Sequence, residues 1–264
     1  MSETTYDNIR VESNGNTTTV TLARPEHLNS LTPAMNEELR EVVTELINDD
    51  GVRCIVLRGA GDAFCAGADL SRFDGSPQDE PIIRQLASTL HETILRLHRA
   101  EKPVVVGVDG SAAGAGFGLA LAGDIVIVSD AARFEFAYPR VGLTGDGGST
   151  YFLPRLVGLR RAKEIVLLDE PIEAERAVEL GIGTEVVAVD DFDERLTEMA
   201  SRLADGPTAA FGRVKRLVTE GFDRRLEEQL AAETDAIAKV TRTEDYASGH
   251  AAFYGDDDPD FVGR

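Results

Sequence analysis

Two loops rich in glycine and alanine have the composition of segments whose backbone contributes to chemistry. One is 114–116, which follows the apolar run at 104–108, and the other is 64–69, which follows the apolar run at 54–57. Residues without bulk are used where another backbone or a ligand must come close. Free N–H groups at the start of a helix can hold an anion, or an oxygen that becomes one during a reaction. As a pair the loops predict an oxyanion hole, although close packing of a strand-to-helix turn also explains the loop at 64–69.

Asp146 is the candidate acid–base group. It lies on a turn bounded by Gly145, Gly147 and Gly148, directly before a helix expected at 149–157. One interpretation is that its side chain caps this helix. The other is that the turn presents a single base to a substrate, with burial raising its pKa toward that task. The residues alone leave both interpretations open.

The elements that must position these groups alternate between strand and helix at first and are helical in the last third. Asn14-Gly15 predicts a hairpin, and Thr32-Pro33 predicts the start of a helix. The pattern predicts one α/β core, 1–200, followed by a helical C-terminal segment, 201–264. The expected strands are 9–12, 17–22, 54–57, 104–108, 125–128, 133–136 and 186–189; the expected helices are 33–48, one ending near 99, 149–157, 159–168, 173–179, 192–204, 208–220 and 223–241.

A dinucleotide-binding fold is the first rival interpretation of the loop at 114–116, because a strand precedes it and another strand follows. However, the glycines run Gly114-x-Gly116-x-Gly118, so the third comes one place too early for the fingerprint G-x-G-x-x-G. Asp130 also follows too soon after these glycines to be the ribose-binding acid of that motif. No Gly-Lys-Ser/Thr follows, which excludes a P-loop.

Metal and serine-nucleophile sites are not predicted. His91-Glu92 is not followed by a second histidine, since position 95 is Leu, and we expect His91 and His98 to lie on a solvated helix surface. The acidic run 256–258 lacks the pattern of a calcium loop and reads as an acidic tail. No G-x-S-x-G is present.

The charge balance and composition exclude further classes. The 264 residues include 47 acidic and 27 basic ones, and a net charge of -20 would repel nucleic acid. With 42% hydrophobic residues the chain can still bury a core, so we expect a carboxylate-rich surface of the kind that salt-loving organisms use. No apolar run is long enough for a membrane span, and the start, MSETTYDN, does not resemble a leader. Two cysteines predict no disulfide framework and a cytoplasmic setting.

The joint motifs resemble the enoyl-CoA hydratase/isomerase (crotonase) superfamily. They are AFCAGADL at 63–70 and VDGSAAGAGFGLALAGDI at 108–125, with agreement at 24–31 and 141–148. The resemblance implies an α/β spiral of ββα units with a helical C-terminal trimerisation region, assembled as homotrimers or homohexamers. It also implies acyl-CoA thioesters as substrates, with no cofactor beyond the coenzyme A of the substrate.

The same resemblance assigns roles to particular residues. The N–H groups of Ala68 and Ala115 would be the oxyanion donors that stabilise a thioester enolate, and Ala66, Asp69 and Leu70 would line the CoA site beside them. The segment 72–83 would border the acyl pocket. Family tails often carry Lys-Arg after a Phe to reach the CoA phosphates, whereas here acidic residues follow Phe253-Tyr254, so the phosphates would have to be held by arginines elsewhere or by bound cations.

The acid–base residues decide the branch. Family hydratases place two glutamates around one water, at the places held here by Gly118 and Arg140. Asp146 falls at the catalytic acid position of the enoyl-CoA isomerases, most closely the 1,2-epoxyphenylacetyl-CoA isomerases, which move one proton with one carboxylate. A dehalogenase of the family also has an aspartate there, but its tryptophan partner is absent from this chain. We therefore expect an enoyl-CoA isomerase, with an enoyl-CoA hydratase (a lyase) or a non-catalytic acyl-CoA-binding protein as alternatives.

Overall fold

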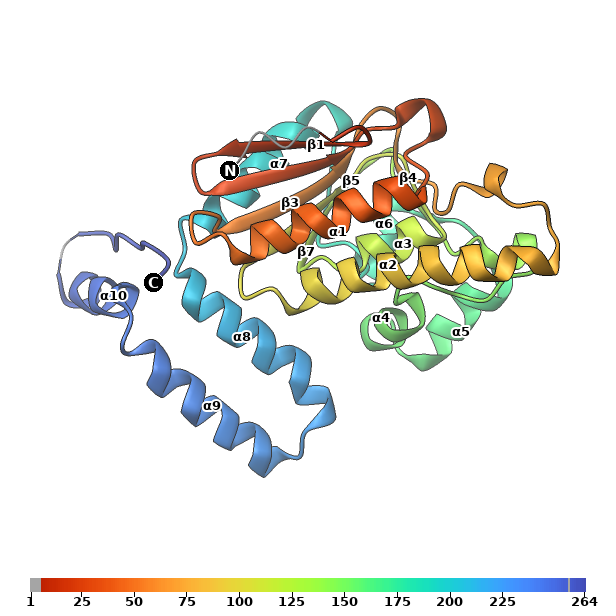
Figure 1. Ribbon diagram of the computed structural model, residues 1–264. Coiled ribbons are helices and arrows are strands. Elements are labelled where there is room, and N and C mark those ends of the chain that lie inside the picture. Colours follow the sequence, from red (N-terminus) through yellow and green to blue (C-terminus); the bar gives the residue numbers. More distant parts are fainter. Residues whose placement is uncertain (1–5, 256) are drawn as a thin grey trace.

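The structure is a computed structural model that describes residues 6–255 and 257–264. The predictions that concern the first five residues and Asp256 lie outside this range. The main sheet has the strand order β1-β2-β3-β5-β7-β10, in which β1 and β2 form the predicted hairpin and all other neighbours are parallel (Figure 1). Its strands are β1 Ile9–Asn14, β2 Thr17–Leu22, β3 Cys54–Gly59, β5 Val104–Val108, β7 Ile125–Ser129 and β10 Glu185–Val187.

The two faces of the main sheet are covered by different elements. Successive side chains of a strand point to opposite faces. Val105 and Ile127 therefore pack on one side against Phe192 and Leu196 of α7 (Phe192–Ala204). Val104, Val106 and Val108 face the other side, where the larger apolar core contains residues of α1 (Pro33–Asn48), α2 (Glu80–Arg99) and α3 (Ala115–Ala120). Ala115, at the start of α3, belongs to this larger core.

A second sheet has the strand order β4-β6-β8-β9, with β4, β6 and β8 parallel and β9 antiparallel to β8. The sequence predicted β8 but not its neighbours, which are at most three residues long. Each of β4, β6 and β8 directly follows a strand of the main sheet, so each turn of the chain adds one strand to each sheet. This is the expected spiral of ββα units. The strands are β4 Ala63–Cys65, β6 Ser111–Ala113, β8 Arg133–Glu135 and β9 Ile172–Glu173.

The helices follow the predicted order with two differences near the C-terminus. The helix expected at 223–241 begins only at Leu226, because 221–223 form a 3-10 turn, and a further helix starts after Thr243, whose hydroxyl accepts a hydrogen bond from Tyr246 N. None of the described helices is long and apolar enough to cross a membrane. The helices are α1 Pro33–Asn48, α2 Glu80–Arg99, α3 Ala115–Ala120, α4 Ser149–Leu156, α5 Leu159–Leu168, α6 Ala174–Glu179, α7, α8 Thr208–Glu220, α9 Leu226–Val240 and α10 Glu244–Tyr254.

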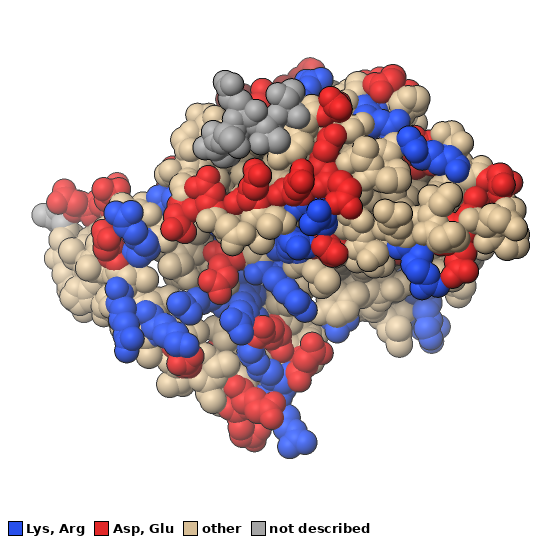
Figure 2. All heavy atoms as spheres, viewed as in Figure 1, with Lys and Arg blue, Asp and Glu red and all other residues tan. Residues whose placement is uncertain are grey.

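The C-terminal helices form an extension from the sheets, and acidic side chains gather on the surface over α1. Helices α8 and α9 pack against each other and extend away from the sheets (Figure 1). Figure 2 shows a row of acidic side chains over α1, which carries Glu37, Glu38, Glu41 and Glu45.

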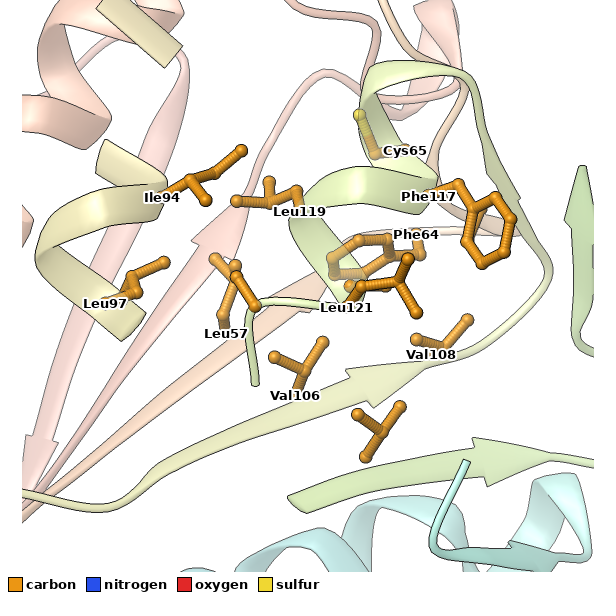
Figure 3. Packing of buried hydrophobic residues seen from close by; sticks show 14 of the residues in the cluster. Leu57, Phe64, Cys65, Ile94, Leu97, Val106, Val108, Phe117, Leu119 and Leu121 are labelled. Atoms are coloured by element: carbon orange, nitrogen blue, oxygen red, sulfur yellow. The ribbon is translucent and has the colours of Figure 1, made fainter. Parts of the chain in front are cut away.

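Helix α3 is held in place by its apolar side chains. Phe117 and Leu119 are fully buried, and they lie among Phe64, Val106 and Val108 in the close view of Figure 3. Because these side chains anchor the helix in the core, its glycines are left to contact the neighbouring loops.

Candidate active site

The two glycine- and alanine-rich loops lie directly against each other. A Cβ built on Gly116 would lie 2.2 Å from the carbonyl oxygen of Cys65. A Cβ on Gly67 would lie 2.9 Å from the carbonyl oxygen of Ala113 and 3.2 Å from the amide nitrogen of Ala115. Gly67 also has φ +91, a conformation that L side chains rarely adopt. The absence of side chains therefore allows the two backbones to meet.

The N–H groups of Ala68 and Ala115 are free to bind a ligand oxygen. Leu31 forms a bridge with Ala68 in which Leu31 N donates to the Gly67 carbonyl (2.7 Å) and Asp69 N donates to the Leu31 carbonyl (3.0 Å). The Ala68 N–H therefore points away from Leu31, and the Ala115 N–H belongs to the first turn of α3, which has no intrahelical partner. Within 6–255 and 257–264 neither N–H has an acceptor. Both residues line the same cavity of about 490 Å³, which we call the inner cavity.

The inner cavity is lined mainly by apolar side chains, and two carboxylate residues, Asp79 and Asp146, also line it. The Asp79 carboxylate accepts hydrogen bonds from the N–H groups of Asp74 and Gly75, which leaves Asp146 as the candidate acid–base group. Part of the cavity wall comes from the segment at 72–83, through Phe73, Gly75, Asp79 and Ile83, and the prediction that this segment borders the acyl pocket stays a prediction. The apolar lining is contributed chiefly by Leu31, Leu70, Phe73, Ile83, Leu86, Ala87, Leu90, Tyr138, Val141 and Leu143. An acyl chain would find an apolar surface here, with polar groups at only a few points.

The residues expected at the CoA site divide into two groups. Ala66 and Leu70 line the inner cavity together with the alanines that carry the free N–H groups. The carboxylate of Asp69 is instead engaged by Ser71 Oγ (2.6 Å) and by the Arg24 guanidinium (3.2 Å). The hydrogen bond from Ser71, which has the largest effect, and the contact with Arg24 hold the pKa of Asp69 below its ordinary value. A role for Asp69 in binding CoA stays a prediction.

The side chain of Asp146 does not cap α4, so the capping interpretation is wrong. Gly148 occupies the cap position without a side-chain hydrogen bond, and Ser149 bonds to the main-chain carbonyl of Asp146 instead. The carboxylate is left for other contacts. It lines the inner cavity and also a second cavity of about 1120 Å³, the outer cavity, which lies among α2, α4 and α8.

His91 of α2 forms a hydrogen bond with the Asp146 carboxylate, and Gly147 N–H donates to the same oxygen. His91 is exposed, as the sequence predicted for a solvated helix surface, but the prediction missed its contact with Asp146; His98 is half-buried. His98 lies edge-on to Phe152, with ring centroids 5.1 Å apart, and both histidines line the outer cavity. Two histidines seven residues apart lie on the same helix face. This spacing was the only feature of the sequence that could have suggested a contact between that face and the turn at Asp146.

The hydrogen bond between His91 and Asp146 shifts the pKa of both side chains. Burial alone would raise the pKa of Asp146, but hydrogen bonds from His91 and from Gly147 N–H outweigh burial and hold that pKa below its ordinary value. The hydrogen bond to Asp146 in turn raises the pKa of His91. A rise in the pKa of Asp146 through burial beside an acyl chain stays a prediction. At neutral pH the carboxylate is ionised, and it can accept a proton.

The positions at which family hydratases carry glutamates are closed or otherwise engaged. A Cβ on Gly118 would lie 2.3 Å from the carbonyl oxygen of Gly147, so the turn that carries Asp146 fills the space. The Arg140 guanidinium is paired with Glu135 and, at 2.7 Å, with Asp169. Neither position supplies a carboxylate, and Gly118 has no room for one.

The described residues offer little for a thiol nucleophile or a metal site. Burial raises the pKa of Cys54 and of Cys65 to about 12, so neither is a thiolate at neutral pH. In the part of the chain that the structure describes, no three His, Cys, Asp or Glu side chains are grouped so that they could hold a metal ion.

Comparison with known proteins decides the family. The model of the enoyl-CoA hydratase/isomerase family matches residues 12–264. The chain belongs to this family. It is 37% identical over 248 residues to 1,2-epoxyphenylacetyl-CoA isomerase of Escherichia coli, covering 93% of this chain and 95% of that protein. It is 38% identical over 259 residues to a probable enoyl-CoA hydratase of Rhodobacter capsulatus, covering 98% of this chain and 99% of that protein.

The fold is shared with solved structures. A putative enoyl-CoA hydratase from Streptomyces coelicolor A3(2) superposes with a TM-score of 0.93 at 35% identity, covering 98% of this chain and 96% of that one. The predicted family and fold class are therefore confirmed, and the chain is an acyl-CoA enzyme of the enoyl-CoA hydratase/isomerase family.

Proposed function

We propose that the protein is an enoyl-CoA isomerase, which shifts a double bond in an enoyl-CoA or isomerises a ring-epoxide phenylacetyl-CoA. The observation that carries the proposal is the ionised carboxylate of Asp146, which lines the same apolar cavity as two free N–H groups. The other carboxylate of that cavity, Asp79, is engaged by backbone N–H groups, and Gly118 has no room for a further one. The Escherichia coli relative named as an isomerase, which is 37% identical, supports this choice.

The proposed mechanism uses both parts of the site. The thioester carbonyl oxygen accepts hydrogen bonds from the N–H groups of Ala68 and Ala115, each of which contributes about 3 kcal/mol to stabilising the enolate. Asp146 takes the proton from C2, and the electron pair of that C–H bond moves into the enolate. The carboxyl group then returns a proton at C4, so the double bond moves and no proton is gained or lost overall.

A hydratase is the alternative within the family, and the relatives named as hydratases support it. Hydration would need a second group to activate water. Among the described residues, Asp146 is the only carboxylate that lines both the inner cavity and the outer cavity. A non-catalytic acyl-CoA-binding protein is the alternative of another class.

The test measures three reactions with wild-type protein and with Asp146→Asn. Wild-type protein should convert a 3-enoyl-CoA to the 2-enoyl-CoA, and Asp146→Asn, which keeps the shape but loses the base, should lower kcat about 100-fold or more. Asp235→Asn, at an exposed ion pair of α9, is the matched control. Unchanged turnover in Asp146→Asn would contradict the assigned role. Faster hydration of crotonyl-CoA than isomerisation would favour a hydratase, and tight CoA-thioester binding without any turnover would favour a binding protein.

We also propose that the enzyme works in the cytoplasm as a homotrimer or homohexamer through the helical segment at 201–264, and needs no cofactor beyond the CoA of its substrate. The support for assembly is that α8, α9 and the turn between them expose apolar side chains, which favours burial against another subunit. Sedimentation velocity measures the state directly. The exposed residues are Val214, Val218, Phe222, Leu226, Leu230 and Ile237.

A further inference from the structure

Asp146 lies in the wall between the two cavities. Together with Tyr138 and Leu143 it lines both of them. Of the described residues, Ala68 and Ala115 line only the inner cavity, and His91 lines only the outer one. The carboxylate can therefore meet a substrate on one side while His91 contacts it from the other.

His91 is the more accessible partner of this pair. Its side chain is 49% exposed, whereas that of Asp146 is 26% exposed. Other charged groups also line the outer cavity, but Asp146 is the one whose charge and hydrogen bond raise the pKa of His91. These other groups are Arg99, Glu101, Lys215, Arg216, Glu220 and Asp223. The pair thus joins a shielded carboxylate to a group that water can reach.

We propose that His91 is the residue through which the proton held by Asp146 exchanges with water, so that part of the hydrogen delivered to the product comes from solvent. The inference rests on the proposed isomerase function, because it concerns the proton that Asp146 carries between C2 and C4. His91 contacts Asp146 and does not line the inner cavity, so it is a positioning residue that also conducts protons.

The proton count balances at each step. When Asp146 takes the proton from C2, its carboxyl group becomes neutral and no longer stabilises the positive charge of the His91 ring. The ring then releases its Nε2 proton to water and accepts the carboxyl proton from Asp146 on the same nitrogen. It exchanges this proton for one from water and passes the water proton back to Asp146, which delivers it to C4. The ring finally takes up a proton from water to regain its charge. Two protons are released and two are taken up, so the isomerisation remains neutral overall.

The experiment is isomerisation of a 3-enoyl-CoA in D₂O, with deuterium at C4 of the product measured by mass spectrometry and NMR at low conversion. Wild-type product should contain deuterium at C4. In His91→Gln the amide can still donate to Asp146 but cannot gain or lose a proton, so deuterium at C4 should fall at least fivefold while kcat stays within tenfold. His98→Gln is the matched control on the same helix and in the same cavity, and its product should match the wild-type product.

Two outcomes would overturn the inference: wild-type product without deuterium, or equal deuterium content in the wild-type and His91→Gln products. An equal loss in His98→Gln would also overturn it. If His91→Gln is unstable, His91→Ala with added imidazole replaces it. Imidazole should then restore deuterium at C4, and failure to do so with active enzyme would count against His91. Failure of the isomerase proposal is recognised separately, since it appears as unchanged turnover in Asp146→Asn.

Discussion

Replacing Gly118 by alanine tests whether the closure of this position holds Asp146 in place. The added Cβ would lie 2.3 Å from the carbonyl oxygen of Gly147, 2.7 Å from its carbonyl carbon and 2.9 Å from its Cα. All three are backbone atoms, so no side-chain rotation relieves the contact. The oxygen is about 1 Å closer than the 3.4 Å at which ordinary van der Waals contact begins, so the turn must move by about that distance.

Two measurable effects follow from that displacement. Overpacking of this kind costs about 1–3 kcal/mol of the free energy of unfolding, which corresponds to a fall in Tm of about 5 °C for a domain of this size. A shift of about 1 Å in a catalytic group can lower the rate about 100-fold. We therefore expect Gly118→Ala to lower kcat for isomerisation about 100-fold, with little change in the KM for the CoA thioester.

The assay compares Gly118→Ala and Gly118→Glu with Gly221→Ala. Gly221 has φ −60, and its added Cβ would meet its nearest neighbour at 3.5 Å, so this control should leave both Tm and kcat unchanged. Gly118→Glu places a carboxylate where a family hydratase would have one, yet we expect no hydration of crotonyl-CoA because the side chain has no space. A Gly118→Glu protein that hydrates crotonyl-CoA and keeps the wild-type Tm would refute the steric argument.

Three further predictions concern stability. The pKa of Asp146 is lowered below its ordinary value of 3.8, and the pKa of His91 is raised above its ordinary value of 6.5. The ion pair therefore stabilises the fold at pH values between 3.8 and 6.5. The contribution of Asp146 is lost as the pH falls, and the contribution of His91 is lost as the pH rises. Urea unfolding should thus show His91→Gln less stable than wild type near pH 6 and nearly equal to it near pH 9. Because the net charge is -20, Tm should rise between about 0.1 M and 2 M KCl, and an unchanged Tm would contradict self-repulsion. Lys215→Met should cost about 3 kcal/mol, measured by the same unfolding, since it leaves the Asp124 carboxylate, 2.7 Å from the Lys215 ammonium, without its ion pair.

The parts of the fold that the sequence predicted are those whose signals are local. The parallel strands of the main sheet are continuous apolar runs, such as Val104–Val108, because both of their faces are buried. The second sheet was largely missed because a strand such as Ala63–Cys65 is only three residues long and pairs with a strand far along the chain. No alternation can be recognised over so few residues.

The site divides in the same way. The glycine loops were recognisable because close backbone contact removes side chains at positions such as Gly67 and Gly116. The partner of Asp146 was not recognisable, since His91 lies 55 residues away and nothing near it in the sequence marks its contact. The lowered pKa of Asp146 could not be predicted either, because it depends on this unrecognised contact with His91. Burial was foreseen, whereas the hydrogen bond that outweighs it depends on the packing of α2 against the turn before α4.

Helix α3 connects the two functions of the site through one set of contacts. Its first residue, Ala115, supplies an N–H to the inner cavity, and Gly118, one turn later, contacts the turn that carries Asp146. A Cβ on Gly147 would lie 3.3 Å from the Ala115 carbonyl and 3.4 Å from Gly118 Cα, so this turn rests on both residues. The spacing between the Ala115 N–H and the turn at Asp146 is therefore set by a six-residue helix that Phe117 and Leu119 anchor in the core. Because the turn at Asp146 fills the space beside Gly118, a carboxylate can enter at Gly118 only if this turn is rebuilt at the same time.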